Sequence, residues 1–95
     1  MNAIATQLSQ AQQLYQAGKL ADAEVVFRHV VQNDPQHTEA LFWLALIADQ
    51  SGRSADSVDY YRKVLALQPD SAEAHGNLGS VLLKLNRVEE AIAHH

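Results

Sequence analysis

The chain has 95 residues, of which 47% are hydrophobic and 19% charged, and its formal net charge is -4. This composition is that of a single small globular domain and excludes a disordered chain. Cysteine is absent, which excludes disulfides and thiolate metal sites. The seven Lys and Arg are scattered along a net-negative chain, so we expect no nucleic-acid partner.

The first seven residues contain no basic region and no long apolar run, so they do not have the pattern of a secretory signal. Nine apolar residues in a row, at 40–48, are the longest hydrophobic stretch that stands out. A bilayer span needs about 20. We therefore expect a cytoplasmic location and no membrane partner.

An internal repeat runs along the chain. Pro35 and Pro69 are 34 residues apart (69 − 35), and so are Gly18 and Gly52 (52 − 18). The same offset relates residues of several chemical types: Phe27 to Tyr61, Val30 to Val64, Ala11 to Ala45 and Gly79, and Ala23 to Ser57 and Ala91. This agreement predicts one domain, residues 1–95, made of repeats at 4–37, 38–71 and 72–95, the last incomplete.

Each unit predicts a pair of helices. The first helix of the chain carries Gln7, Gln10 and Gln13, which give it the polar face of a terminal repeat with nothing stacked on it. The apolar run at 40–48 predicts a helix buried between two neighbours. In this second unit we expect helices at about 39–51 and 54–67. The first should end at Gly52 in the left-handed conformation, and the second should end before Pro69.

The third unit has Asn86 where the others have glycine. Asparagine is the next-best residue for the left-handed conformation, so we expect a turn here as well. Small residues should lie where the two helices of a unit approach closely, which predicts that Gly79 packs against the helix that contains Ala91.

The repeat resembles the tetratricopeptide repeat, a helix-turn-helix unit of about 34 residues with the pattern W-x2-L-G-x2-Y, then A, F and P. The second unit matches this pattern with Leu41, Leu44, Ala45, Ala48, Ser57, Tyr61 and Pro69, and the third with His75, Leu78, Gly79, Leu82 and Ala91. The resemblance implies an all-α solenoid of antiparallel helix pairs, wound as a right-handed superhelix of about two and a half repeats. It also implies a scaffold that binds a peptide or a partner helix in the concave groove lined by the first helix of each unit.

Ten of the residues at the family's groove positions are candidates for binding: Leu8, Gln12, Tyr15, Glu39, Phe42, Trp43, Leu46, Asn77, Ser80 and Lys84. Phe42, Trp43 and Leu46 exceed what the core of the second unit needs, and each aromatic side chain buries about 150–250 Å². Two interpretations stay open for them. They form a hot spot that grips an apolar side chain, or their rings complete the packing between repeats. Phe42 and Leu46, four residues apart, are the better groove candidates.

The ligand expected from these residues is apolar to mildly basic. One tetratricopeptide subclass binds acidic chaperone tails through a Lys and Asn clamp, but the corresponding places here hold Leu8, Gln12, Trp43, Gly76 and Ser80, with Lys84 as the one nearby cation. Glu39, Asp49 and Glu73 add negative charge to the same face.

Asn77 has two interpretations. It resembles the asparagine row that binds peptide backbone in the repeats of O-GlcNAc transferases, but Ser9 and Trp43 occupy the matching places, so no row exists. The alternative is that a single asparagine satisfies its own neighbours.

No pattern in the sequence predicts catalysis. The five histidines lack the His-Glu-x-x-His spacing, His75 is expected to pack in the core, and no phosphate loop or nucleophile motif occurs. We therefore predict a protein that is not an enzyme and takes no cofactor or metal. His94 and His95 are read either as native residues or as the start of a purification tag.

Two further readings stay open. The chain is the N-terminal, substrate-recruiting segment of a larger enzyme such as a glycosyltransferase, or it forms a homodimer through its uncapped third repeat, where Leu85, Val88 and Ile92 supply an apolar edge. The incomplete third repeat leads us to expect a fragment of a longer protein or an end covered by another chain.

Overall fold

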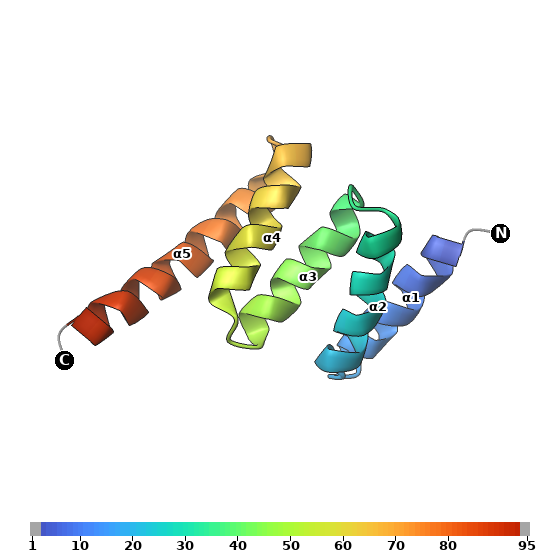
Figure 1. Cartoon of the computed structure of the whole chain (residues 1–95), viewed down its shortest axis with the longest axis horizontal. Coiled ribbons are helices and arrows are strands. Elements are labelled where there is room, and N and C mark those ends of the chain that lie inside the picture. The colour runs from blue at the N-terminus through green and yellow to red at the C-terminus, as the bar shows by residue number, and fades with distance from the viewer. Residues whose placement is uncertain (1–2, 94–95) are drawn as a thin grey trace.

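The computed structural model describes residues 3–93, with the side chains of 3–87. In this part of the chain there are five α-helices and no strand: α1 (Ala3–Gln16), α2 (Leu20–Asn33), α3 (Thr38–Gln50), α4 (Ser54–Leu67) and α5 (Ala72–Ala93). They follow one another along an elongated body of 54 × 29 × 20 Å (Figure 1). The side chains of Val88 and Ile92, and the whole of His94 and His95, lie outside the described residues.

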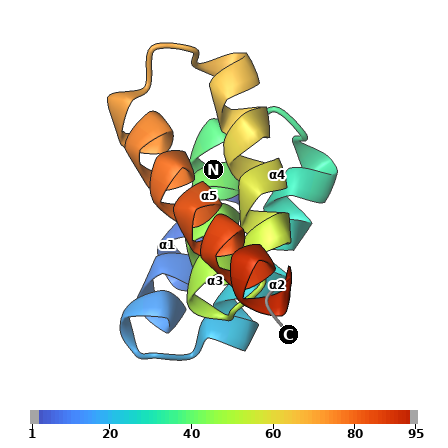
Figure 2. The same ribbon diagram turned by 90° about the vertical axis from the view of Figure 1, so that its left-hand side faces the viewer.

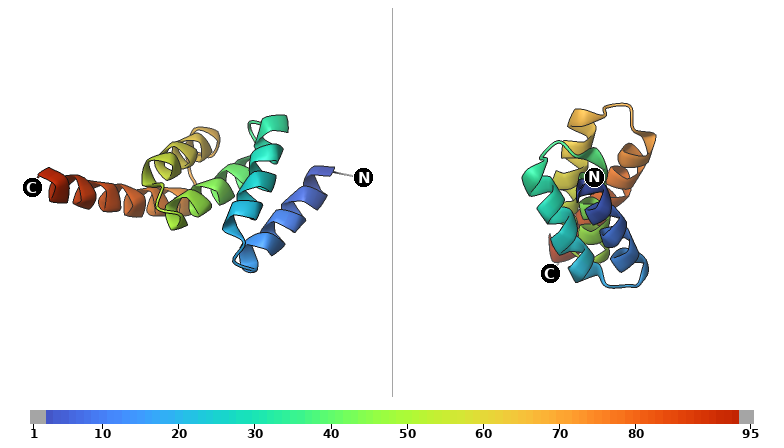
Figure 3. Two further views of the ribbon diagram at one scale, coloured as in Figure 1. Left: turned by 60° about the horizontal axis from the view of Figure 1, so that its bottom comes forward. Right: turned by 90° about the vertical axis from the view of Figure 1, so that its right-hand side faces the viewer.

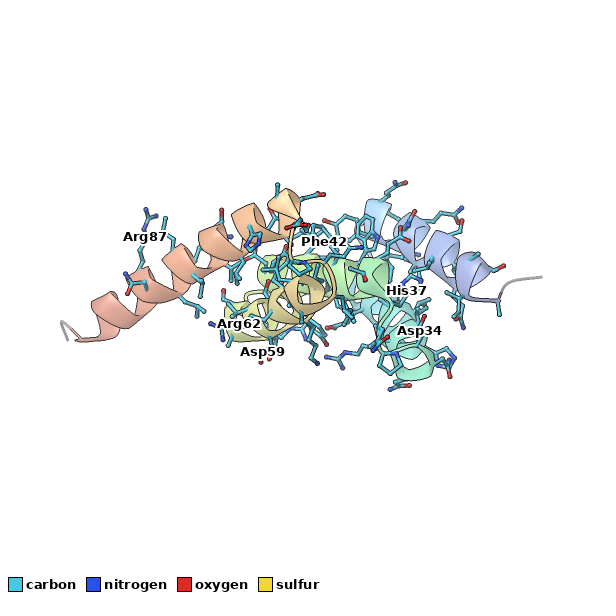
Figure 4. The ribbon with its side chains drawn as sticks, turned by 90° about the horizontal axis from the view of Figure 1, so that it is seen from above. Asp34, His37, Phe42, Asp59, Arg62 and Arg87 are labelled. Atoms are coloured by element: carbon cyan, nitrogen blue, oxygen red, sulfur yellow. The ribbon has the colours of Figure 1, made fainter. Side chains whose placement is uncertain are left out.

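The helices form two rows. Seen from above, α1 and α5 lie toward one face of the molecule with Phe42 of α3 between them, whereas α2 and α4 lie toward the other face (Figure 4). The view along the long axis shows α1 on the left and α2 and α4 on the right, while α5 begins on the left and crosses toward the lower right (Figure 2). The expected all-α helical-repeat solenoid is therefore confirmed.

Helix α3 is the centre of the fold, as its apolar run predicts. Six of its residues are buried: Ala40, Leu41, Leu44, Ala45, Ile47 and Ala48. Three of them, Ala40, Leu44 and Ile47, join Phe27 and Val30 of α2 in one core cluster. Leu41 and Ala45 join Tyr61 and Val64 of α4 in a second. Since the two clusters share α3, this helix holds the repeats together.

The turns within the first two repeats have the predicted glycine caps. Gly18 and Gly52 adopt φ values of 81° and 79°, in the left-handed region that favours glycine. In the second turn the N–H of Arg53 bonds the carbonyl of Ala48 at 2.8 Å, and the N–H of Gly52 bonds that of Asp49 at 3.2 Å. This is the Schellman arrangement, and it reverses the chain so that α4 packs back on α3.

The turn predicted at Asn86 is wrong. Helix α5 continues through this residue to Ala93, and no described residue other than glycine has a positive φ. A left-handed conformation strains asparagine more than glycine, whereas a helical conformation suits asparagine better than glycine. The balance that forms the other two turns is therefore reversed here, and α5 projects beyond α4 (Figure 3).

This straight helix also explains two other differences. Gly79 was predicted to meet a second helix, but it is exposed, and no atom of another helix lies within 4 Å of the place where a Cβ would stand. His75 was predicted to lie in the core, but it is exposed, and its Nε2 lies 2.8 Å from the carbonyl oxygen of Pro69. Because the chain does not fold back after residue 86, no described helix covers this face of α5.

Candidate functional site

A hollow of about 400 Å³ lies on the groove face of the solenoid. Helix α3 presents its residues 39, 42, 43 and 46 there, since positions three and four apart share one helix face. The hollow is closed by the end of α4, the connection that follows it and the start of α5. Its lining is Thr38, Glu39, Phe42, Trp43, Leu46, Val64, Gln68, Ser71 and Glu73.

Phe42 and Leu46 give the hollow its apolar surface. Both side chains are half-buried. Phe42 packs edge-on against Tyr61, with ring centroids 5.6 Å apart and an interplanar angle of 80°. The figure from above places Phe42 on the face between α1 and α5 (Figure 4). A fixed, partly exposed aromatic ring of this kind is what an apolar ligand side chain can pack against.

Trp43 lies between two other rings. Its ring is stacked on Phe27 at a centroid distance of 5.6 Å and an angle of 7°, and it meets the edge of Tyr15 at 4.9 Å and 65°. Tyr15 and Phe27 belong to the first repeat, so Trp43 packs repeat two on repeat one. Trp43 also lines the hollow. The packing interpretation therefore holds for this ring, and the hot-spot interpretation stays a prediction.

Polar contacts join neighbouring groove helices. Gln12 of α1 donates to Oε1 of Glu39 at 3.2 Å, and the side-chain amide of Gln50 donates to the hydroxyl of Tyr15. Between α3 and α5, Nζ of Lys84 contacts both carboxylate oxygens of Asp49 at 3.1 Å. Lys84 is therefore already paired with a carboxylate of its own chain.

Asn77 is hydrogen-bonded to the buried hydroxyl of Tyr61. Burial raises the pKa of Tyr61 to about 12, and the carboxylates of Asp49 and Glu73 act in the same direction, while the bond with Asn77 opposes them. Asn77 thus has a partner within the fold, as the second interpretation of this residue expected.

The other predicted residues are distributed around this centre. Glu39, Phe42, Trp43 and Leu46 line the hollow. Leu8 is partly buried against the first core cluster. Ser80 is exposed, and its hydroxyl donates to the carbonyl of Gly76 at 3.2 Å. Of the ten candidates, the structure gathers four around one hollow.

Four lining residues were missed by sequence reasoning: Thr38, Val64, Gln68 and Ser71. Thr38 is the first residue of α3. The other three belong to the end of α4 and the connection to α5, whereas the family pattern places groove positions on the first helix of each unit. The proline between Gln68 and Ser71 was the available signal, because it fixes where α4 ends and the chain turns toward α5.

The described residues contain no group of three or more His, Asp or Glu positioned to hold a metal ion. Among the same residues, no helix combines the length and the apolar character that a bilayer crossing requires.

The two rows of antiparallel helices and the groove between successive repeats define the chain as a helical-repeat solenoid. The tetratricopeptide repeat model matches residues 8–71 and again 48–94, and the chain belongs to this family. Solved structures agree: a MamA variant with 21% identity has a TM-score of 0.81 over 99% of this chain and 69% of its own. At that identity the likeness shows the fold.

Three further relatives are more similar in sequence. An O-GlcNAc transferase from Thermobaculum terrenum is 32% identical, with a TM-score of 0.82 over 95% of this chain and 17% of its own. The DnaJ homolog subfamily C member 3 of Mus musculus is 33% identical over 88% of this chain and 17% of its own length. A probable biofilm formation methyltransferase, WspC of Pseudomonas aeruginosa, is 36% identical over 58% of this chain and 13% of its own. The chain thus spans less than a fifth of these relatives.

Proposed function

We propose that this chain is a non-catalytic module that binds a protein partner by taking a peptide or a helix of that partner into the groove between α1, α3 and α5. The observation that carries the proposal is the hollow beside α3, where Phe42 and Leu46 expose apolar surface between two neighbouring helices. Recognition of extended or helical segments by an apolar anchor in a groove is a general mode of peptide binding. The cytoplasmic location and the absence of a nucleic-acid partner stay predictions.

Selection from a phage-displayed library of random peptides tests the proposal. Peptides enriched on the wild-type chain are synthesised, and their affinities are measured for the wild type, Phe42→Ala, Leu46→Ala and Val25→Ala. Val25 is the matched control, because it is an apolar residue of α2 that is 68% exposed. We expect affinity to fall about tenfold or more in the two groove variants, as for anchor residues of other interfaces, and to stay unchanged in Val25→Ala.

Circular dichroism of each variant establishes that it is folded before affinities are compared. Failure to enrich any peptide, or equal affinity for the wild type and both folded groove variants, would contradict the proposal.

A second candidate is that the module recruits substrates for a larger enzyme. It is favoured by the partial matches to a glycosyltransferase and a methyltransferase. The similar region makes up 17% of the glycosyltransferase chain and 13% of the methyltransferase. Sequencing the source gene on both sides of this segment tests it directly. A catalytic domain in the same reading frame would support the candidate, and a complete gene of this length would remove it.

Self-association through α5 is a third candidate, favoured by Leu82 and Leu83, which are 40% and 51% exposed. Light scattering over a wide concentration range measures the solution mass. A dimer that is lost in Leu83→Lys and kept in Phe42→Ala would place self-association on α5 and leave the groove open. A monomer at all concentrations would exclude this candidate.

A further inference from the structure

We infer that the hollow beside α3 selects a peptide segment in which an apolar side chain is flanked by lysine or arginine. This inference rests on the proposed function and adds the chemistry of the ligand to it. The apolar side chain would lie against Phe42 and Leu46, and the basic side chain would approach Glu39 and Glu73 at the rim.

The charges around the hollow are of one sign. Among the described lining residues there are two carboxylates, Glu39 and Glu73, and no lysine or arginine. Lys84 of the groove helix α5 lies 3.1 Å from both carboxylate oxygens of Asp49, so its charge is already balanced. An incoming cation therefore finds uncompensated negative charge here, and an incoming carboxylate finds repulsion.

The two glutamates come from different helices, so their proximity at the hollow results from the tertiary fold. Glu39 lies in the first turn of α3 and Glu73 in the first turn of α5. Acidic residues are favourable in a first helical turn for reasons of helix stability alone. That effect accounts for an acid on each helix, but the tertiary fold brings both to one apolar hollow.

Glu39 is also held in position. Its Oε1 accepts a hydrogen bond from Gln12 of the neighbouring helix α1 at 3.2 Å. A carboxylate that is already oriented loses less side-chain entropy when it pairs with a ligand.

The remaining lining residues agree with a peptide occupant. Thr38, Gln68 and Ser71 add side chains that hydrogen-bond without carrying charge. Backbone N–H and C=O groups of a bound segment can be satisfied by such side chains. The hollow therefore combines an apolar wall, neutral polar groups and an acidic rim.

The test uses the peptides enriched by phage display on the wild-type chain. We expect Lys or Arg within two positions of an apolar residue in most of them. For one enriched peptide, versions with the basic residue replaced by glutamine or glutamate are compared by fluorescence anisotropy at low and high salt. Rim charges of this exposure predict that the basic version binds about three- to tenfold more tightly than the glutamine version at low salt, with the difference shrinking at high salt.

Matched variants locate the effect. In Glu39→Gln/Glu73→Gln the preference for the basic peptide should disappear while binding of the glutamine version is kept. In Asp56→Asn, which removes an exposed carboxylate of α4 outside the hollow, the preference should be unchanged. In Glu39→Lys/Glu73→Lys the order should be inverted, so that the glutamate version binds best.

Enriched peptides that need Phe42 and Leu46 but show no basic preference would overturn this inference and leave the proposed function standing. A basic preference that survives in Glu39→Gln/Glu73→Gln would also overturn it. Failure to enrich any groove-dependent peptide would overturn the proposed function itself.

Discussion

Replacing Trp43 separates the structural role of this residue from a role in binding. Its ring is stacked on Phe27 and meets Tyr15 edge-on, so Trp43→Ala removes the aromatic contact between the first two repeats. Truncation of a buried Phe or Trp to Ala costs about 3–5 kcal/mol. Since Trp43 is half-buried, we expect a loss near the lower end, about 3 kcal/mol of unfolding free energy.

A loss of that size is large for a domain whose total stability is on the order of 5–15 kcal/mol. Urea unfolding followed by far-ultraviolet circular dichroism is the appropriate assay, because Trp43 is the only tryptophan and its fluorescence is lost with it. Val25→Ala, on an exposed site of α2, is the control and should change stability by no more than about 0.5 kcal/mol.

A double-mutant cycle of Trp43→Ala with Phe27→Leu measures the stacked pair itself, for which we expect a coupling of about 0.5–1.5 kcal/mol. A loss below about 1 kcal/mol in Trp43→Ala, together with no coupling in the cycle, would refute the view that this ring joins the repeats.

Three other predictions follow from single features of the fold. Burial raises the pKa of Tyr61 to about 12 from its ordinary 10.0, so the neutral phenol stabilises the fold fully below pH 10, and this stabilisation is lost as pH rises toward 12. The loss approaches about 1.4 kcal/mol of unfolding free energy per pH unit. Alkaline unfolding of Tyr61→Phe should lack it. Glu24→Gln removes the carboxylate that contacts Arg28 and Arg53 at 3.3 and 2.7 Å. Because both arginines are more than a third exposed, we expect urea unfolding to show a loss of only about 1 kcal/mol of unfolding free energy, and a smaller loss at high salt. Asn86→Gly should weaken α5 and reduce the hydrogen-exchange protection of the amides that follow, whereas Asn86→Ala should keep this protection. Equal protection in both variants would contradict a continuous helix.

Most of the fold was predictable, because the same pattern of residue types occurs in two successive repeats. The 34-residue offset pairs Phe27 with Tyr61, and both are buried at equivalent places in their repeats. The apolar run at 40–48 predicted the central helix, which is buried between two core clusters. In a repeat protein each unit forms its core with its neighbours, so the periodicity of the sequence is sufficient to predict the fold.

The prediction failed where only one weak local preference decided the outcome. At residue 86 the pattern predicted a turn, but glycine is what makes that turn favourable, and the residue present is asparagine. The error also misplaced Gly79, whose expected partner helix is the continuation of its own.

The candidate site was predictable only in part. Positions on one helix face follow from spacing, so Glu39, Phe42 and Leu46 were identified correctly as neighbours. The walls contributed by Gln68 and Ser71 depend on how helices meet in space. For Trp43 the sequence offered packing between repeats as one of two interpretations, and the stacking on Phe27 supports it. No single-helix pattern encodes such contacts.

Amide chemical-shift mapping with an enriched peptide tests the central claim most directly, because it reports where on the chain a ligand binds. The account predicts that saturable shifts gather in α3, around Phe42 and Leu46, and at the start of α5, around Glu73. Shifts confined to the outer faces of α2 and α4, with the hollow unaffected, would contradict it.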